Sequence, residues 1–299
     1  MGKIYVGTAS WTDPTLTQST LFYPSKAMSA EERLRFYASH FNAVEVDSTY
    51  YALPAERMVM LQTERTPADF KLSYKAFGAL TRHPVDVRRL PKAVKALMSP
   101  PVLEGDRLDF RGVEPEVLDL MFDMFRNALK PADEAGKLGA VLFQFPPYFT
   151  YDTENMDYIV KCKEKLPDYD LAIEFRHSSW TTGPNRQRTI EFLRSNGLTY
   201  TVVDEPQFES RSTAPFIPVT TGNVSYVRFH GRNKEAWFKK GITTAERFAY
   251  LYSEEELGEL GEEIRVLIKE TDATYVLFNN CFQDYGVRNA KMMKAILTP

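Results

Sequence analysis

The chain has 299 residues, of which 43% are hydrophobic and 26% are charged, and its formal net charge is −3. This composition is typical of a folded globular protein with a sizeable core, and it excludes disorder over the whole length. The near balance of 37 basic and 40 acidic side chains provides no electrostatic footprint for duplex DNA or an anionic membrane.

Two cysteines, Cys162 and Cys281, occur without CxxC spacing, so we expect neither a disulfide framework nor a structural zinc site. The first residues enter a strand pattern without an apolar signal segment, and no run of about 18 apolar residues occurs. We therefore expect a cytoplasmic protein that does not bind membranes. Nothing in the pattern indicates an oligomeric state.

Short β-branched and aromatic runs alternate with amphipathic stretches along the chain. They predict strands at Lys3–Thr8, Ala43–Ser48, Phe70–Lys75, Ala140–Gln144, Asp170–Phe175, Thr199–Asp204, Val224–Phe229 and Thr274–Asn279. Helices are predicted between them at Ala30–His40, Arg57–Glu64, Glu114–Leu129, Glu154–Leu166, Arg186–Ser195 and Glu254–Lys269. Eight strands that alternate with helices favour a parallel (β/α)₈ TIM-type barrel over an open sheet. No GxGxxG turn follows the first strand, which disfavours a dinucleotide-binding half.

We expect one barrel domain over residues 1–299, with an insertion within it at residues 76–138. This connection after the third strand is much longer than a βα unit needs, and it contains a basic stretch and a Pro100-Pro101 turn. Because it leaves the carboxyl end of a strand, a lid over the barrel mouth is one interpretation. A solvated helical excursion is the other.

Seven of the eight predicted strands carry Glu, Asp, Lys, Arg, His, Gln or Asn at or next to their carboxyl ends. An unpaired charge inside a barrel costs several kcal/mol, whereas barrel enzymes place catalytic groups at the carboxyl ends of strands. With a period of two, the polar residues on the inner faces are Glu45, Asp47, Lys75, Gln144, Glu174, Arg176, Asp204, Arg228, His230, Arg232 and Asn280. We therefore expect one functional cluster at the mouth.

Three residues of this cluster are expected to be catalytic. Glu45 or Glu174 would be the general base, and His230 the acid, since cationic neighbours lower the pKa of a histidine and keep it neutral. Arginine and lysine side chains would bind an anion. The expected substrate-binding residues are Trp11, Asp47, Tyr50, Lys75, Gln144, Arg176, His177, Asp204, Arg228, Arg232 and Asn280.

Each of these residues also has a structural alternative. Glu45 and Asp47 could form ion pairs with arginines of the same cluster. His177 could cap its loop, and Trp11 and Tyr50 could be core or rim aromatics rather than stack on a sugar. The carboxylates could hold a divalent metal, but histidine is scarce and the arginines oppose a cation, so no cofactor is predicted and a metal is disfavoured.

Several motifs follow one another along nearly the whole chain: GTASW (Gly7–Trp11), HFNAVEVDSTYYALP (His40–Pro54), LGAVLFQFPP (Leu138–Pro147), EFRHSSW (Glu174–Trp180), RFHGR (Arg228–Arg232) and FNN (Phe278–Asn280). Together they resemble the YecE-like proteins, called domain of unknown function 72. The resemblance implies a barrel fold but no established activity, and a relation to sugar isomerases rests on fold analogy. The chain departs from the family pattern at Ala9-Ser10 and at Thr81-Arg82-His83.

The cluster favours an enzyme (an isomerase, lyase or hydrolase) that acts on a small anionic substrate, such as a sugar acid or sugar phosphate. One alternative is a metal-dependent phosphodiesterase or nucleic-acid-processing factor, against which the overall acidity and the clustered arginines count. A non-catalytic barrel that binds a metabolite is the other.

Overall fold

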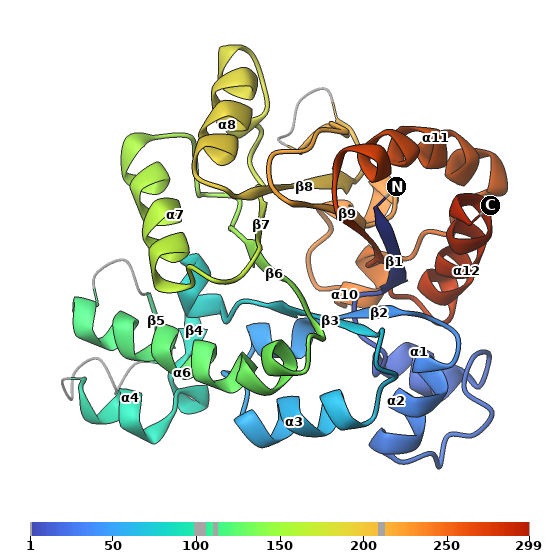
Figure 1. Ribbon diagram of the computed structural model, residues 1–299, viewed down its shortest axis with the longest axis horizontal. Coiled ribbons are helices and arrows are strands. Elements are labelled where there is room, and N and C mark those ends of the chain that lie inside the picture. The colour runs from blue at the N-terminus through green and yellow to red at the C-terminus, as the bar shows by residue number, and fades with distance from the viewer. Residues whose placement is uncertain (1, 99–105, 110–112, 209–212, 299) are drawn as a thin grey trace.

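The computed structural model describes residues 2–98, 106–109, 113–208 and 213–298. Eight parallel strands form a nearly closed barrel in the order β1-β10-β9-β8-β7-β6-β3-β2 (Figure 1). Their bounds are β1 (Lys3–Thr8), β2 (Ala43–Val46), β3 (Lys71–Lys75), β6 (Leu138–Gln144), β7 (Leu171–Glu174), β8 (Thr199–Asp204), β9 (Val224–Phe229) and β10 (Ala273–Phe278). The predicted TIM-type barrel is confirmed, and each strand end lies within two residues of its prediction.

Side chains complete the barrel between β1 and β2, where the backbone ladder is reduced to a single bridge. The Tyr37 hydroxyl accepts the Thr8 N–H at 2.7 Å and donates to the Ala43 carbonyl at 3.1 Å. The Asn42 amide bonds the β1 backbone through its oxygen and its nitrogen, at 2.9 and 2.8 Å. A Cβ atom at Gly7 would lie 1.9 Å from the Ala43 carbonyl oxygen, so only glycine allows this close approach.

Helices surround the barrel (Figure 1). The longer ones are α2 (Ala30–Ala38), α3 (Glu56–Glu64), α6 (Pro115–Glu134), α7 (Thr153–Lys165), α8 (Pro184–Ser195), α11 (Glu254–Glu270) and α12 (Tyr285–Leu297). α2 and α11 each begin in a capping box, formed by Ser29 with Glu32 and by Ser253 with Glu256. α6 runs five residues beyond its prediction, through Pro131, because buried Ala132 continues its apolar face.

Short helices follow the carboxyl ends of several strands. They are α1 (Pro14–Ser19), η1 (Asp47–Tyr50), η5 (Ser178–Trp180), α9 (Lys234–Trp237) and α10 (Thr244–Arg247). In the part of the chain that the structure describes, no helix is both long and apolar enough to cross a membrane.

The long connection after β3 consists of an added part followed by an ordinary barrel helix. The added part contains η2 (Gly78–Thr81), β4 (Val85–Asp86), η3 (Val87–Arg89), α4 (Lys92–Ala96) and β5 (Arg107–Leu108), and β4 pairs antiparallel with β5. α6 packs against α3 and β6, as a crossover helix does. A pocket of about 570 Å³ separates the added part from Tyr50 and Tyr51 at the rim. The Pro100-Pro101 turn lies outside the described residues, and the lid stays a prediction.

The barrel interior changes from apolar to polar along its axis. Its apolar layer contains Tyr5, Leu142, Tyr226, Tyr275 and Leu277, and the Tyr5 and Tyr275 rings stack at 5.1 Å. Because the Tyr226 hydroxyl donates to Glu45 at 2.9 Å, the aromatic layer also supports the charged groups above it.

Candidate active site

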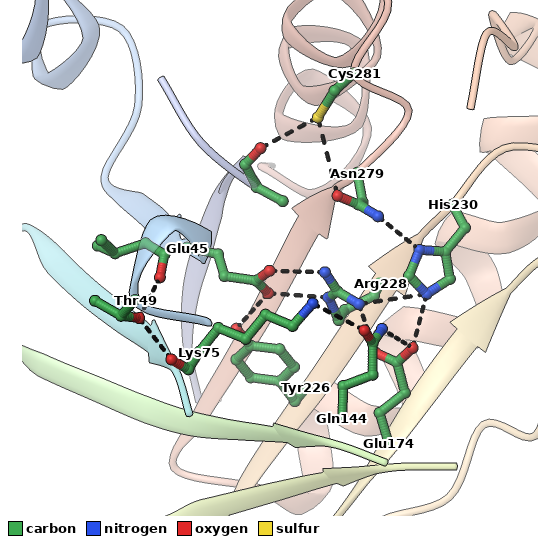
Figure 2. A network of polar contacts seen from close by, with 12 residues as sticks. Glu45, Thr49, Lys75, Gln144, Glu174, Tyr226, Arg228, His230, Asn279 and Cys281 are labelled. Atoms are coloured by element: carbon green, nitrogen blue, oxygen red, sulfur yellow. Dashed lines mark hydrogen bonds and ion pairs between the residues drawn. The ribbon is translucent and has the colours of Figure 1, made fainter. Parts of the chain in front are cut away.

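A buried ion-pair network centred on Arg228 occupies the barrel mouth (Figure 2). From β9, Arg228 donates to both oxygens of Glu45 on β2, through Nε at 2.9 Å and Nη2 at 2.7 Å. Its Nη1 lies 2.5 Å from Glu174 Oε2 on β7, and none of the three side chains is more than 1% exposed. Burial disfavours the charged guanidinium, but Glu174 and Glu45 outweigh it and raise the pKa of Arg228 above its ordinary value. The structural alternative for Glu45, an ion pair with an arginine of the cluster, is therefore the arrangement in the structure.

Glu174 connects this network to a histidine and an amide. Its Oε1 accepts from Gln144 Nε2 at 2.6 Å and contacts His230 Nε2 at 3.0 Å. Burial acts to raise the pKa of Glu174, but the charge of Arg228 and the hydrogen bond from His230 hold it well below the ordinary value. Glu174 is therefore a carboxylate at neutral pH.

His230 is neutral. Burial, more than its cationic neighbours, lowers its pKa to about 3. Its partners assign the tautomer: Nε2–H donates to Glu174, and Nδ1 accepts from Asn279 Nδ2 at 2.9 Å. The ring is fully buried, so His230 orients the Glu174 carboxylate from inside the protein and is not exposed at the mouth.

Lys75, at the end of β3, is a half-buried cation of the mouth. Its Nζ donates to Gln144 Oε1 at 2.8 Å and lies 4.6 Å from the centre of the Tyr50 ring. Burial and the charge of Arg228 lower the pKa of Lys75 to about 8.

Arg176 follows β7, and its side chain is 18% exposed. Its Nη1 makes single contacts with Glu174 Oε1 at 3.4 Å and with Glu205 Oε2 at 3.2 Å. The guanidinium lies 5.2 Å from the Trp237 ring. Both contacts are longer than those of Arg228, and both are made by Nη1 alone. The Arg176 guanidinium therefore keeps N–H donors for another partner.

Asp47 lies beyond the end of its strand. The prediction of a strand to Ser48 is wrong: β2 ends at Val46, and Asp47 begins η1, so the period of two does not place it beside Glu45. The two carboxyl groups nevertheless interact, since burial and then the charge of Glu45 raise the pKa of Asp47 to about 6.

Asp204 and Arg232 form a second cluster beside the network. Arg232 Nε and Nη2 donate to the two Asp204 oxygens at 2.9 and 2.7 Å, and the Tyr252 hydroxyl donates to Asp204 at 2.6 Å. The expectation that Arg232 lies in line with Arg228 is wrong, because β9 ends at Phe229 and Gly231 turns the chain with φ +85°. Asp204 and Arg232 line a pocket of about 280 Å³.

Three expected substrate-binding residues lie apart from the network. Asn280 is fully buried and donates to a backbone carbonyl and to Asn289. His177 Nδ1 accepts the Ser179 N–H and caps η5, as its structural alternative states. Trp11 is 9% exposed and lines a pocket of about 400 Å³ together with residues of α2 and α3.

Four residues of the mouth were missed in the sequence. His83 contacts Thr81 Oγ1 at 2.9 Å and packs edge-on against Tyr50, and burial and then Lys75 lower its pKa to about 3. Glu205 follows the expected site residue Asp204, and Asn279 precedes the expected Asn280. These neighbours were the only sign in the sequence that the two residues belong to the mouth. His83 lies in the Thr81-Arg82-His83 stretch that departs from the family pattern, which was a signal for it, whereas nothing in the sequence marks Trp237. Among the described residues, no group of three or more His, Cys, Asp or Glu side chains is arranged to hold a metal ion.

The fold and the mouth define a class: a (β/α)₈ barrel with a carboxylate–arginine network at the carboxyl ends of its strands. Residues 5–299 match the family model described as protein of unknown function DUF72, and the chain belongs to this family. The resemblance shown by the motifs is thereby confirmed.

Relatives in several bacteria support the assignment. UPF0759 protein YunF of Bacillus subtilis (strain 168) is 33% identical over 98% of this chain and 94% of its own length. UPF0759 protein YecE of Escherichia coli (strain K12) is 32% identical over 67% of this chain and 59% of its own length. The crystal structure of a DUF72 family protein from Thermotoga maritima MSB8 has a TM-score of 0.76 and 32% identity, with 99% of each chain covered. One from Enterococcus faecalis V583 has a TM-score of 0.79 and 26% identity, with 98% of this chain and 95% of that chain covered.

Proposed function

We propose that this protein is an enzyme that binds a small anionic substrate, such as a sugar acid or sugar phosphate, at the barrel mouth and transforms it by general acid/base chemistry. The observation that carries the proposal is the pair of cations at the mouth, Lys75 and Arg176. Both are partly accessible, and neither has a bidentate carboxylate partner among the described residues.

The four cations expected to bind the anion divide into two groups. Arg228 and Arg232 are held by bidentate carboxylates, so they neutralise charge inside the protein. Lys75 and Arg176 remain for a ligand. A guanidinium can grip a carboxylate or phosphate through two parallel hydrogen bonds, and an ammonium adds a point charge beside it.

Asp47 is the proposed acid/base group. A carboxyl group with a pKa of about 6 can both give and take a proton near neutral pH, which is the condition for efficient proton transfer. Glu45, Glu174 and His230 are fully buried. Glu45 is hydrogen-bonded to Arg228, and Glu174 to His230. In this proposal the three side chains hold the other residues of the mouth in place and do not touch the substrate.

A non-catalytic metabolite-binding barrel is the second candidate. It is favoured by the completeness of the buried network, in which Arg228 bonds both oxygens of Glu45 and one oxygen of Glu174. The two candidates share the anion site and differ in turnover, so the same ligand screen serves both.

The test is a thermal-shift screen of the purified protein against sugar acids, sugar phosphates and other organic acids. A ligand at 100 times its Kd stabilises the protein by about 2.7 kcal/mol, which is about 4 °C for a chain of this length. We expect such a shift to disappear in Arg176→Ala and to persist in Arg126→Ala, a control on the outer surface of α6. A shift that persists in Arg176→Ala would contradict the proposal. Chemical change of the ligand during incubation separates the enzyme from the binding barrel.

A further inference from the structure

Lys75 has an unusual partner for a lysine inside a cluster of carboxylates. Its hydrogen bond goes to the neutral Gln144 amide, and within the described residues no carboxylate oxygen lies within the 4.0 Å that defines an ion pair with its Nζ. The amide cannot turn around, because Gln144 Nε2 donates to Glu174 at 2.6 Å. Figure 2 shows this chain of contacts, in which Glu174 orients Gln144 and Gln144 holds Lys75.

A lysine held by an amide can lose its proton more readily than one held by a carboxylate. Glu45, Glu174 and Asp47 favour the ammonium, but burial and the charge of Arg228 outweigh them and lower the pKa of Lys75 to about 8. At pH 7 such an amine is neutral about two hundred times more often than a lysine with the ordinary pKa near 10.4. A neutral amine that donates one N–H to Gln144 keeps a lone pair for another atom.

The geometry points to Lys75 as a nucleophile, and we propose that it captures the carbonyl group of a small anionic aldehyde or ketone as an imine. This inference rests on the proposed function, because Arg176 would bind the anionic group of the same molecule. It specifies the substrate class as an α-keto acid or a sugar phosphate in its open carbonyl form.

The capture step needs no group from outside the site. The Nζ lone pair forms a bond to the carbonyl carbon, and the carbonyl oxygen takes a proton from Asp47. The hydroxyl group then leaves as water after a second protonation, while the nitrogen loses its two protons and the C=N bond forms. Asp47 recovers the protons that it lends, so the net change is loss of one water molecule, without an oxidant or a reductant.

The test is reductive trapping. The full-length protein is incubated at pH 7 with glyoxylate, pyruvate or dihydroxyacetone phosphate in the presence of cyanoborohydride, which reduces an imine to a stable secondary amine. Peptide mass mapping then locates the adduct. Lys71, at the opposite end of β3 and bonded to backbone carbonyls, is the internal control, and Lys75→Arg keeps the positive charge without an amine that can form an imine.

We expect at least one probe to modify Lys75, with little adduct at Lys71 and none at position 75 in Lys75→Arg. Comparable labelling of both lysines would overturn the inference, because burial lowers the pKa of Lys71 as well and Lys75 would then show no reactivity of its own. A probe that stabilises the protein through Arg176 yet leaves Lys75 unmodified would also overturn it, while the proposed function would stand. No stabilisation and no adduct with any probe would count against both.

Discussion

Replacing Arg228 by methionine should destabilise the protein strongly and in a pH-dependent way. The substitution roughly keeps the side-chain volume but removes the cation that the fully buried Glu45 and Glu174 share, so that Glu174 keeps only its longer contact with Arg176. Removing one partner of a buried ion pair costs about 3–5 kcal/mol, and because one arginine serves two carboxylates we take the upper end, about 5 kcal/mol. With an unfolding entropy of about 2.1 cal/mol/K per residue, this is a fall in Tm of about 8 °C at pH 7.5.

The pH dependence follows from where the protons go. In Arg228→Met, burial and mutual repulsion raise the pKa values of the two carboxyl groups, so they take up protons in the folded state. The folded variant then binds more protons than its unfolded chain. Its stability therefore falls as pH rises and recovers as pH falls. We expect the deficit in Tm relative to the wild type to shrink by about half between pH 7.5 and pH 5.

The assay is thermal unfolding followed by circular dichroism at one scan rate, at both pH values. Arg35→Met is the matched control, since Arg35 forms an exposed i,i+4 pair with Glu31 on α2 and its loss should change Tm by no more than about 1 °C. The reasoning is refuted if Arg228→Met melts within about 2 °C of the wild type at pH 7.5, or if its deficit is the same at pH 5.

Three further predictions concern the barrel and its carboxylates. Tyr37→Phe removes the hydroxyl that joins Thr8 to the Ala43 carbonyl; urea unfolding should show a loss of about 1–3 kcal/mol, and no loss would mean that the side chain does not close the barrel. Gly7→Ala should lower Tm, because its Cβ atom would meet a backbone oxygen. Gly258→Ala, in open space on α11, is the control and should raise Tm slightly. A higher Tm for Gly7→Ala than for Gly258→Ala would contradict the close approach of β1 and β2. In the wild type the pKa of Glu174 is lowered on folding, so its contribution is present above the unfolded pKa and is lost as pH falls; Tm should drop below about pH 4, and a flat profile to pH 3 would contradict this.

Most of the barrel could be predicted from the sequence, because its strands are β-branched and aromatic runs separated by amphipathic stretches. β8 and β9 begin and end at the predicted residues, and both are buried along their whole length. The seam between β1 and β2 could not be predicted. It depends on Tyr37, a helical residue that reads as one more aromatic on an apolar face.

The membership of the site was easier to predict than the partners within it. Alternation along β7 and β9 correctly brings Glu174, Arg228 and His230 to one place, but it fails at Arg232, because Gly231 turns the chain beyond the end of β9. Arg232 therefore pairs with Asp204 in the second cluster, and Asn279, rather than the expected Asn280, contacts His230. Which cations stay accessible depends on distances between strands, and a sequence alone does not contain them.

The most direct measurement of the central claim is the crystal structure of the protein with the most stabilising anion bound. The account predicts that the carboxylate or phosphate group lies within hydrogen-bonding distance of Lys75 Nζ and the Arg176 guanidinium, with Arg228 still bonded to Glu45 and Glu174. An anion bound in the pocket beside Arg88 and Arg107, with Lys75 and Arg176 unoccupied, would contradict it.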